Sequence, residues 1–170
     1  MSYLISSADV CTKTKLKTDA QGALSCDPIS GNIGSLPTLF TQDGTFNHEA
    51  NSYLFYQKAI NQAKDLSSCA KALYAYYQFL EDNGLTWDHF PPVKRLKPTY
   101  QFRSHLLKQV KLEELAKSTA SVRMNHVVNY YKWLMHDGYL RIKNEKEAPF
   151  KIEFVSVAYS GEVEQPFRPT

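Results

Sequence analysis

The chain has 170 residues, which is enough for one well-buried core and short for two. Hydrophobic residues make up 43% of it and aromatic residues 13%, a composition that excludes an intrinsically disordered protein. The net charge of +3 hides an uneven distribution: residues 94–143 hold 11 Lys or Arg against 3 Asp or Glu, and the rest holds 9 against 14. A basic centre between acidic ends indicates a polyanionic partner, although a solvated lysine-rich helical surface gives the same counts.

Several classes of protein are excluded by what the sequence lacks. No run of 18 apolar residues exists, so no segment is expected to span a membrane, and the N-terminus lacks the basic leader of a secretory signal. The three cysteines are widely spaced and match no zinc or redox pattern, which favours reduced thiols in a cytoplasmic protein.

The first 45 residues carry four of the seven glycines and show no helical period. The stretches SYLISSADV (2–10) and LPTLF (36–40) are typical of short strands, and TQDGT (41–45) is typical of a turn. We therefore predict an arm or small hairpin module over residues 1–45.

Two helical segments follow. In residues 47–64, Asn47 is a candidate N-cap and Glu49 lies in the first turn. The apolar positions of this segment are Tyr53, Leu54, Tyr56 and Ile60. Residues 66–84 carry a stronger apolar stripe of Leu66, Cys69, Leu73, Tyr76, Tyr77 and Leu80, and Gly84 is placed to end the helix. No Pro or Gly separates the two segments, so one long helix is an alternative to a bend near residues 62–67.

A connector, residues 86–98, holds two consecutive prolines, a basic cluster and a third proline. Helical spacing resumes after it, with Thr99 as the cap and an apolar stripe of Tyr100, Leu106 and Leu107. Residues 111–117 predict a short helical turn.

The last helix begins at Ser118 or Thr119, either of which can cap it, and stops at Gly138. Its predicted inner stripe is Met124, Val127, Val128, Tyr131, Leu134 and Met135. The alternating apolar residues in 152–157 predict one strand, and the final residues are linker-like. The expected fold is mainly α, a bundle of four to five helices over residues 46–143, with short β or extended segments in 1–45 and 144–170.

A search for catalytic and metal-binding motifs finds none. The five histidines form no HExxH site, and the glycines form neither a dinucleotide-binding nor a P-loop pattern. No nucleophile elbow occurs, and the acidic pairs Glu81–Asp82 and Glu113–Glu114 are expected on outer helical faces. No enzyme active site, metal or cofactor is therefore predicted.

Two stretches together resemble the core-binding domain of tyrosine recombinases, the phage integrase family. They are ALYAYYQFLEDNGL (72–85) and STASVRMNHVVNYYKWLMHDGYL (118–140), and residues 36–57 look like the segment that precedes this domain. The matching positions are Ser118, Arg123, Met124, Val127, Tyr130, Tyr131, Trp133, Leu134, Gly138 and Leu140. The resemblance covers roughly residues 47–143. It departs from the family after Gly138, where Asn144 and Pro149 stand apart instead of forming an Asn-Pro boundary.

The resemblance implies a SAM-like helical bundle that binds double-stranded DNA and holds a recombination half-site of a mobile element. The family's catalytic arginine, lysine, HxxR motif and tyrosine belong to a second domain, and no histidine here has Arg three residues later. This chain is therefore expected to cleave no DNA, and residues 144–170 are expected to lead toward a missing catalytic domain. The resemblance also implies a homo-oligomer on DNA in the full-length protein, in the bacterial cytoplasm and associated with the nucleoid.

Candidate DNA-binding residues are those that neutralise phosphates or bond to phosphates and base edges. On and beside the last helix they are Lys117, Ser118, Thr119, Arg123, Asn125, His126, Asn129, Lys132 and Arg141. Elsewhere they are Lys71, Tyr74, Lys94, Arg95, Lys97 and Arg103. We expect Arg123, His126, Asn129 (or Tyr130) and Lys132 to lie away from the apolar stripe. The alternative function is a helical protein-interaction module whose basic connector docks an acidic partner.

Overall fold

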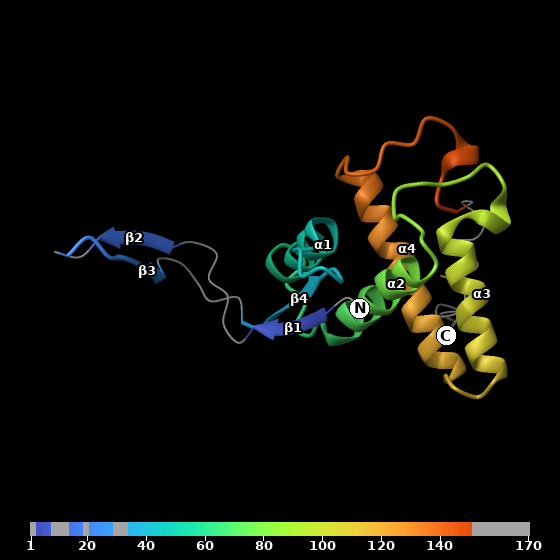
Figure 1. Ribbon diagram of the computed structural model, residues 1–170, viewed down its shortest axis with the longest axis horizontal. Helices are drawn as coiled ribbons and strands as arrows, with labels where there is room; N and C mark the ends of the chain where they lie inside the picture. Colours follow the sequence, from blue (N-terminus) through green and yellow to red (C-terminus); the bar gives the residue numbers. More distant parts are fainter. Residues whose placement is uncertain (1–2, 8–13, 19–20, 29–33, 151–170) are drawn as a thin grey trace, which may run out of the picture. The chain divides into compact units, whose positions relative to one another are not determined.

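The computed structural model describes residues 3–7, 14–18, 21–28 and 34–150. Within them the chain forms four α-helices, two short 3₁₀ helices and four short strands, so the predicted mainly helical class is confirmed (Figure 1). The chain divides into two compact units, one up to Ala70 and the other from Lys71 onward. The domain limits drawn from composition stay a prediction, and the strand expected in 152–157 lies outside the described residues.

The strands of the first unit form two antiparallel pairs. Strand β1 (Tyr3–Ser7) pairs with β4 (Leu36–Phe40), with Tyr3 opposite Phe40, and both were expected from the sequence. Strand β2 (Thr14–Thr18) pairs with β3 (Leu24–Pro28), and neither was predicted. Their sequences, TKLKT and LSCDP, contain few apolar residues, so the alternation that indicates a half-buried strand is weak.

Helix α1 (His48–Ala59) is attached to β4 by a side chain. The predicted N-cap is confirmed, since the Asn47 side chain accepts a hydrogen bond from the Ala50 amide at 3.0 Å. One turn later, the buried Asn51 amide bonds both backbone groups of Leu39, at 2.7 and 2.8 Å. The placement of Ile60 in the apolar stripe was wrong, because it follows the last helical residue and its side chain is 64% exposed.

Helix α2 (Ser67–Asp82) is separate from α1, so the single long helix is excluded. Gln62, in the connection between them, has a left-handed φ of 54°. All six residues of the predicted α2 stripe are buried. Gly84 has the positive φ of 60° expected after the helix, and Leu85 donates its amide back to the Leu80 carbonyl at 2.9 Å.

The second unit continues with η1 (Lys94–Leu96), α3 (Pro98–Lys111), α4 (Lys117–His136) and η2 (Glu145–Glu147). Two predicted caps were wrong. Thr99 is the second residue of α3, and its hydroxyl donates to the Pro149 carbonyl instead of capping the helix. Helix α4 begins at Lys117 after Ala116, which places Ser118 and Thr119 inside its first turn.

Residues 112–116 form a tight turn rather than the predicted helical turn. Glu113 has a positive φ of 58°, and its amide donates to the Val110 carbonyl at 3.1 Å. The next amide, that of Glu114, donates to the Gln109 carbonyl at 3.0 Å. This bond pair normally ends a helix at a glycine, and no glycine stands here to indicate it.

The core of the second unit lies between α2, α3 and α4, and it is rich in aromatic side chains. The Tyr76 ring lies 5.0 Å from that of Phe102 on α3 and 5.9 Å from that of Tyr131 on α4, both edge-on. The predicted inner and outer positions of the helices need three corrections. Leu107 is exposed, Met135 is only half-buried, and Tyr130, the expected alternative to Asn129 on the outside, is fully buried.

Two tyrosine pairs join α2 to α4 through their hydroxyl groups. Tyr76 and Tyr131 are 2.7 Å apart, and Tyr77 and Tyr130 are 2.6 Å apart. The Tyr131 hydroxyl also donates to the Trp87 carbonyl at 2.6 Å, so the core holds the connector that leads to η1.

Candidate basic pocket and helix surface

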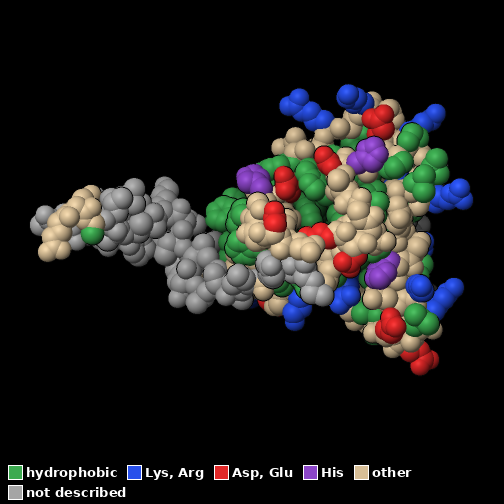
Figure 2. Space-filling view, in the orientation of Figure 1, with side chains coloured by type: hydrophobic (Ala, Val, Ile, Leu, Met, Phe, Trp, Pro, Cys, Tyr) green, Lys and Arg blue, Asp and Glu red, His purple; other side chains and the backbone are tan. Residues whose placement is uncertain are grey.

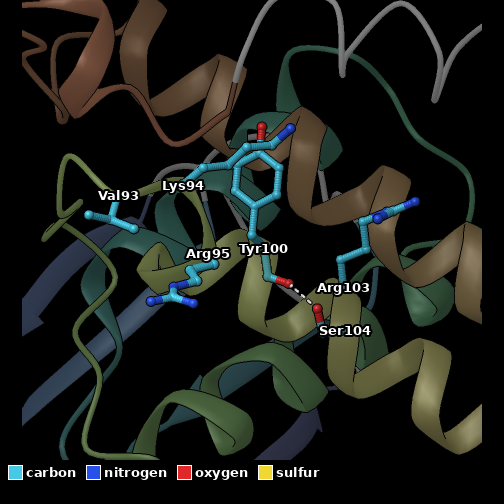
Figure 3. Close-up of a pocket in the computed structure, with 6 residues that line it drawn as sticks. All are labelled: Val93, Lys94, Arg95, Tyr100, Arg103 and Ser104. Carbon is cyan, nitrogen blue, oxygen red and sulfur yellow. Dashed lines mark hydrogen bonds between the residues drawn. The ribbon is translucent and has the colours of Figure 1, made fainter.

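A pocket of about 410 Å³ lies where the connector meets the start of α3 (Figure 3). The connector and η1 contribute Val93, Lys94 and Arg95, and the first two turns of α3 contribute Tyr100, Arg103 and Ser104. Three of the six lining residues are cations and none is acidic. The pocket therefore combines positive charge with one aromatic ring and one hydroxyl.

The local sequence fixes this corner of the fold. Pro91 and Pro92 favour an extended backbone, and Pro98 occupies the first turn of α3, where its missing amide hydrogen costs nothing. The Gln101 side-chain amide reaches back to the Leu96 carbonyl at 2.7 Å. These features set the direction in which Lys94 and Arg95 leave the backbone.

The cations of the pocket are arranged around Tyr100. The Lys94 ammonium lies 4.9 Å from the centre of the Tyr100 ring, a cation–π distance. The Ser104 hydroxyl donates to the Tyr100 carbonyl at 3.0 Å, as Figure 3 shows. In the same view Arg95 and Arg103 lie on opposite sides of Tyr100 and point away from each other. The three positive charges are therefore spread over a surface and do not converge on one point.

The electrostatic surroundings reinforce this positive charge. The sequence from His89 to Leu112 has no Asp or Glu but six Lys or Arg, and the first turn of α3 has no acidic residue. Since a helix N-terminus carries partial positive charge, cations placed there are mutually unfavourable unless an anion is near. Figure 2 shows Lys and Arg side chains projecting from the upper and right-hand edges of the helical unit.

Lys97 differs from the other basic residues of this segment. Its side chain is only 5% exposed, and its ammonium donates to the Ala148 carbonyl. Burial lowers the pKa of this lysine. Together with the bond from Thr99 to Pro149, this contact fixes residues 148–149 against the start of α3. The structure thus places Lys97 inside the unit, away from the lining of the pocket.

The candidates on α4 do not form a single edge. Asn129 is exposed, Lys132 and Asn125 are half-buried, and Lys117, Ser118 and Thr119 are exposed in the first turn. Arg123 precedes Lys132 by nine residues, about two and a half helical turns, so the two leave α4 on opposite sides. The four residues expected to lie away from the apolar stripe, Arg123, His126, Asn129 and Lys132, are all exposed or half-buried.

His126 is also half-buried on α4, and burial lowers its pKa. It is therefore neutral at physiological pH and does not add to the positive charge. On α2, Lys71 is exposed and Tyr74 is half-buried, and beyond α4 Arg141 is exposed. Of the fifteen candidates, the structure brings Lys94, Arg95 and Arg103 together around one pocket.

Sequence reasoning missed the pocket residues Val93, Tyr100 and Ser104. The signal that could have found two of them is the helical repeat, because Tyr100, Arg103 and Ser104 are spaced by three and one residues on one side of α3. Tyr100 had instead been assigned to the apolar stripe. Tyr100 belongs to the apolar core, since it is mostly buried, and it also lines the pocket.

Two other kinds of site were searched for among the described residues. No group of three or more His, Cys, Asp or Glu side chains is close enough there to hold a metal ion. In that same part of the chain, no helix is both long and apolar enough to cross a membrane.

Comparisons of the chain with protein-family models, curated proteins and solved structures give no match. The fold and the pocket define a protein with a small helical domain that carries a basic surface at the start of α3.

Proposed function

We propose that the helical unit from Lys71 to Phe150 binds double-stranded DNA through the basic surface around η1 and α3. The observation that supports this most directly is the pocket lined by Lys94, Arg95 and Arg103 within a segment that has no acidic residue. Each lysine or arginine near a phosphate releases condensed counterions, which is the main source of affinity in such complexes.

The spread of the cations favours a polyanion over a small anionic metabolite. A site for one small anion has donors that converge, often in a bidentate arrangement. Arg95 and Arg103 diverge on either side of Tyr100 (Figure 3). Diverging cations suit successive phosphates along a strand, and the neutral His126 and exposed Asn129 on α4 suit hydrogen bonding rather than charge neutralisation.

The resemblance of residues 72–85 and 118–140 to the core-binding domain of tyrosine recombinases supports a narrower form of the proposal. In that form the unit is a SAM-like bundle that holds a recombination half-site and leaves strand cleavage to another domain. The proposal for DNA binding does not depend on this narrower form, because it rests on the charge and geometry of the pocket.

Fluorescence anisotropy with a labelled duplex, measured over a series of salt concentrations, tests DNA binding. We expect the logarithm of affinity to fall linearly with the logarithm of salt concentration, and Arg95→Gln with Arg103→Gln to reduce that slope by about 2. A matched control removes two exposed lysines outside the pocket, Lys64→Gln with Lys146→Gln. Far-UV circular dichroism confirms that all variants are folded.

Two results would overturn the proposal. One is the absence of binding at low salt. The other is an equal loss of slope in the two double variants, because that would mean the protein responds to net charge and not to the pocket.

A further inference from the structure

Helix α3 continues from the pocket as an outward face with an apolar centre. Leu107 is 45% exposed, and Arg103 and Lys111 lie four residues before and after it on the same side of the helix. Lys108 is its immediate neighbour and is also exposed. A leucine is thus surrounded by three cations.

A second exposed leucine lies at the end of the helix, five residues after Leu107 and therefore about 140° around the helix axis from it. Leu112, the C-cap residue of α3, is 57% exposed. Four of the large hydrophobic residues that are exposed in the described part of the chain fall between residues 93 and 112. They are Val93, Leu96, Leu107 and Leu112. Scattered single residues of this kind need no explanation, but the concentration of them within one basic segment sets that segment apart from the rest of the described chain.

Phosphate contacts account for the cations of this face but not for Leu107, since a sugar-phosphate backbone gains little from an aliphatic side chain. Protein interfaces, in contrast, place apolar groups at the centre and polar groups at the rim. The charges of the rim are all positive from His89 to Leu112, so a complementary partner is acidic.

We propose that the outward face of α3 from Arg103 to Lys111 docks an acidic amphipathic helix of a partner protein. Leucine or phenylalanine side chains of that helix cover Leu107, while its glutamates or aspartates pair with Arg103, Lys108 and Lys111. This docking goes beyond DNA binding and does not rest on it. Because Arg103 belongs to both surfaces, the acidic helix and DNA compete for the protein.

The probe is a synthetic labelled peptide of about 18 residues, long enough for a stable helical face, with leucines at i, i+3, i+4 and i+7 and glutamates elsewhere. Anisotropy with the full chain should show saturable binding. Leu107→Gln should weaken it roughly fivefold to tenfold, as expected when one partly exposed leucine no longer becomes buried. Val122→Ser, which removes an exposed apolar residue from α4, is the control and should change little.

A second peptide with the same composition, but with its leucines distributed around the helix, tests the apolar centre. Equal affinity for both peptides, or equal affinity of wild type and Leu107→Gln, would overturn the docking proposal and leave only non-specific charge attraction. The same Leu107→Gln variant should bind duplex DNA like wild type. A peptide that binds while duplex does not would reject DNA binding alone, and the reverse would reject the docking alone.

Discussion

The hydroxyl groups of Tyr76 and Tyr131 lie 2.7 Å apart in the core, and the direction of their hydrogen bond is fixed by a third group. Tyr131 donates its only hydroxyl hydrogen to the Trp87 carbonyl at 2.6 Å. Tyr76 must therefore donate to Tyr131. The result is a directed series of hydrogen bonds from α2 through α4 to the connector, in which Tyr131 both accepts and donates.

Because this series of hydrogen bonds has a direction, the two tyrosines should not contribute equally to stability. Tyr131→Phe removes an acceptor from Tyr76 and a donor from Trp87, and we expect it to lower the free energy of unfolding by about 2 kcal/mol. Tyr76→Phe leaves the bond to Trp87 intact and should cost about 1 kcal/mol. Urea denaturation of both single variants and the double variant checks this. Equal losses of stability in the two single variants, or strictly additive losses in the double variant, would contradict the directed series of hydrogen bonds.

One buried side-chain amide contributes to the attachment of α1 to β4. Asn51 bonds both the amide and the carbonyl of the fully buried Leu39. The Asn47 amide also donates to that carbonyl, at 3.1 Å, so Asn51→Ala removes the hydrogen-bond partner of the Leu39 amide and one of two donors to its carbonyl. We expect a loss of about 2–3 kcal/mol and faster hydrogen exchange at the Leu39 amide. Asn61→Ala, which removes an exposed amide, is the control and should cost less than about 0.5 kcal/mol. Unchanged exchange at Leu39 would show that the bonds are not made in solution.

The turn between α3 and α4 contains a residue in a conformation that glycine adopts more easily. Glu113 has a φ of 58°, and it lies just past the C-terminus of α3, where a negative charge is also unfavourable. Glu113→Gly should raise the free energy of unfolding by roughly 0.5–1 kcal/mol. Glu113→Gln removes the charge and keeps the backbone strain, so it should gain only a few tenths. Thermal unfolding separates the two, and an equal gain would assign the effect to charge alone.

Much of the fold follows from local sequence signals, and the errors have a common physical cause. Asn47, the α2 stripe and Gly84 were correctly predicted because capping and helical periodicity act within one or two turns. Leu107 was misassigned because apolar character alone does not say whether a neighbouring element covers a helix. The extent of burial at Tyr130 depends on its partner Tyr77, 53 residues away in the sequence.

The candidate site was foreseen in charge but not in geometry. The basic cluster of the connector is visible in the sequence, and the pocket contains two of its members, Lys94 and Arg95. Lys97 belongs to the same cluster, yet its ammonium is buried and donates to the carbonyl of Ala148. Such long-range partners leave no local trace, so the sequence cannot separate an available lysine from a buried one.

The buried hydroxyl and thiol groups should make the protein less stable at alkaline pH. Burial raises the pKa of the Cys69 thiol to about 12, and it raises the pKa of the Tyr76 and Tyr131 hydroxyls above their ordinary value of 10.0. Once pH exceeds their ordinary values, the unfolded chain loses these protons while the folded chain keeps them. The free energy of unfolding should therefore fall as pH rises above about 9–10.

Lys97 provides an internal control for this prediction, because its effect on stability changes with pH in the opposite direction. Its pKa is lowered in the folded chain, so between that value and the ordinary 10.5 the unfolded chain holds more protons, and the Lys97 contribution to stability rises with pH. Lys97→Met, which keeps most of the length of the side chain but not its charge, should make the alkaline decline steeper. Urea midpoints measured at about pH 7, 9 and 10.5 for wild type and variant check both signs. A wild-type midpoint that stays level across this range would contradict the buried tyrosine and cysteine contributions, and a shallower decline in Lys97→Met would contradict the burial of the lysine.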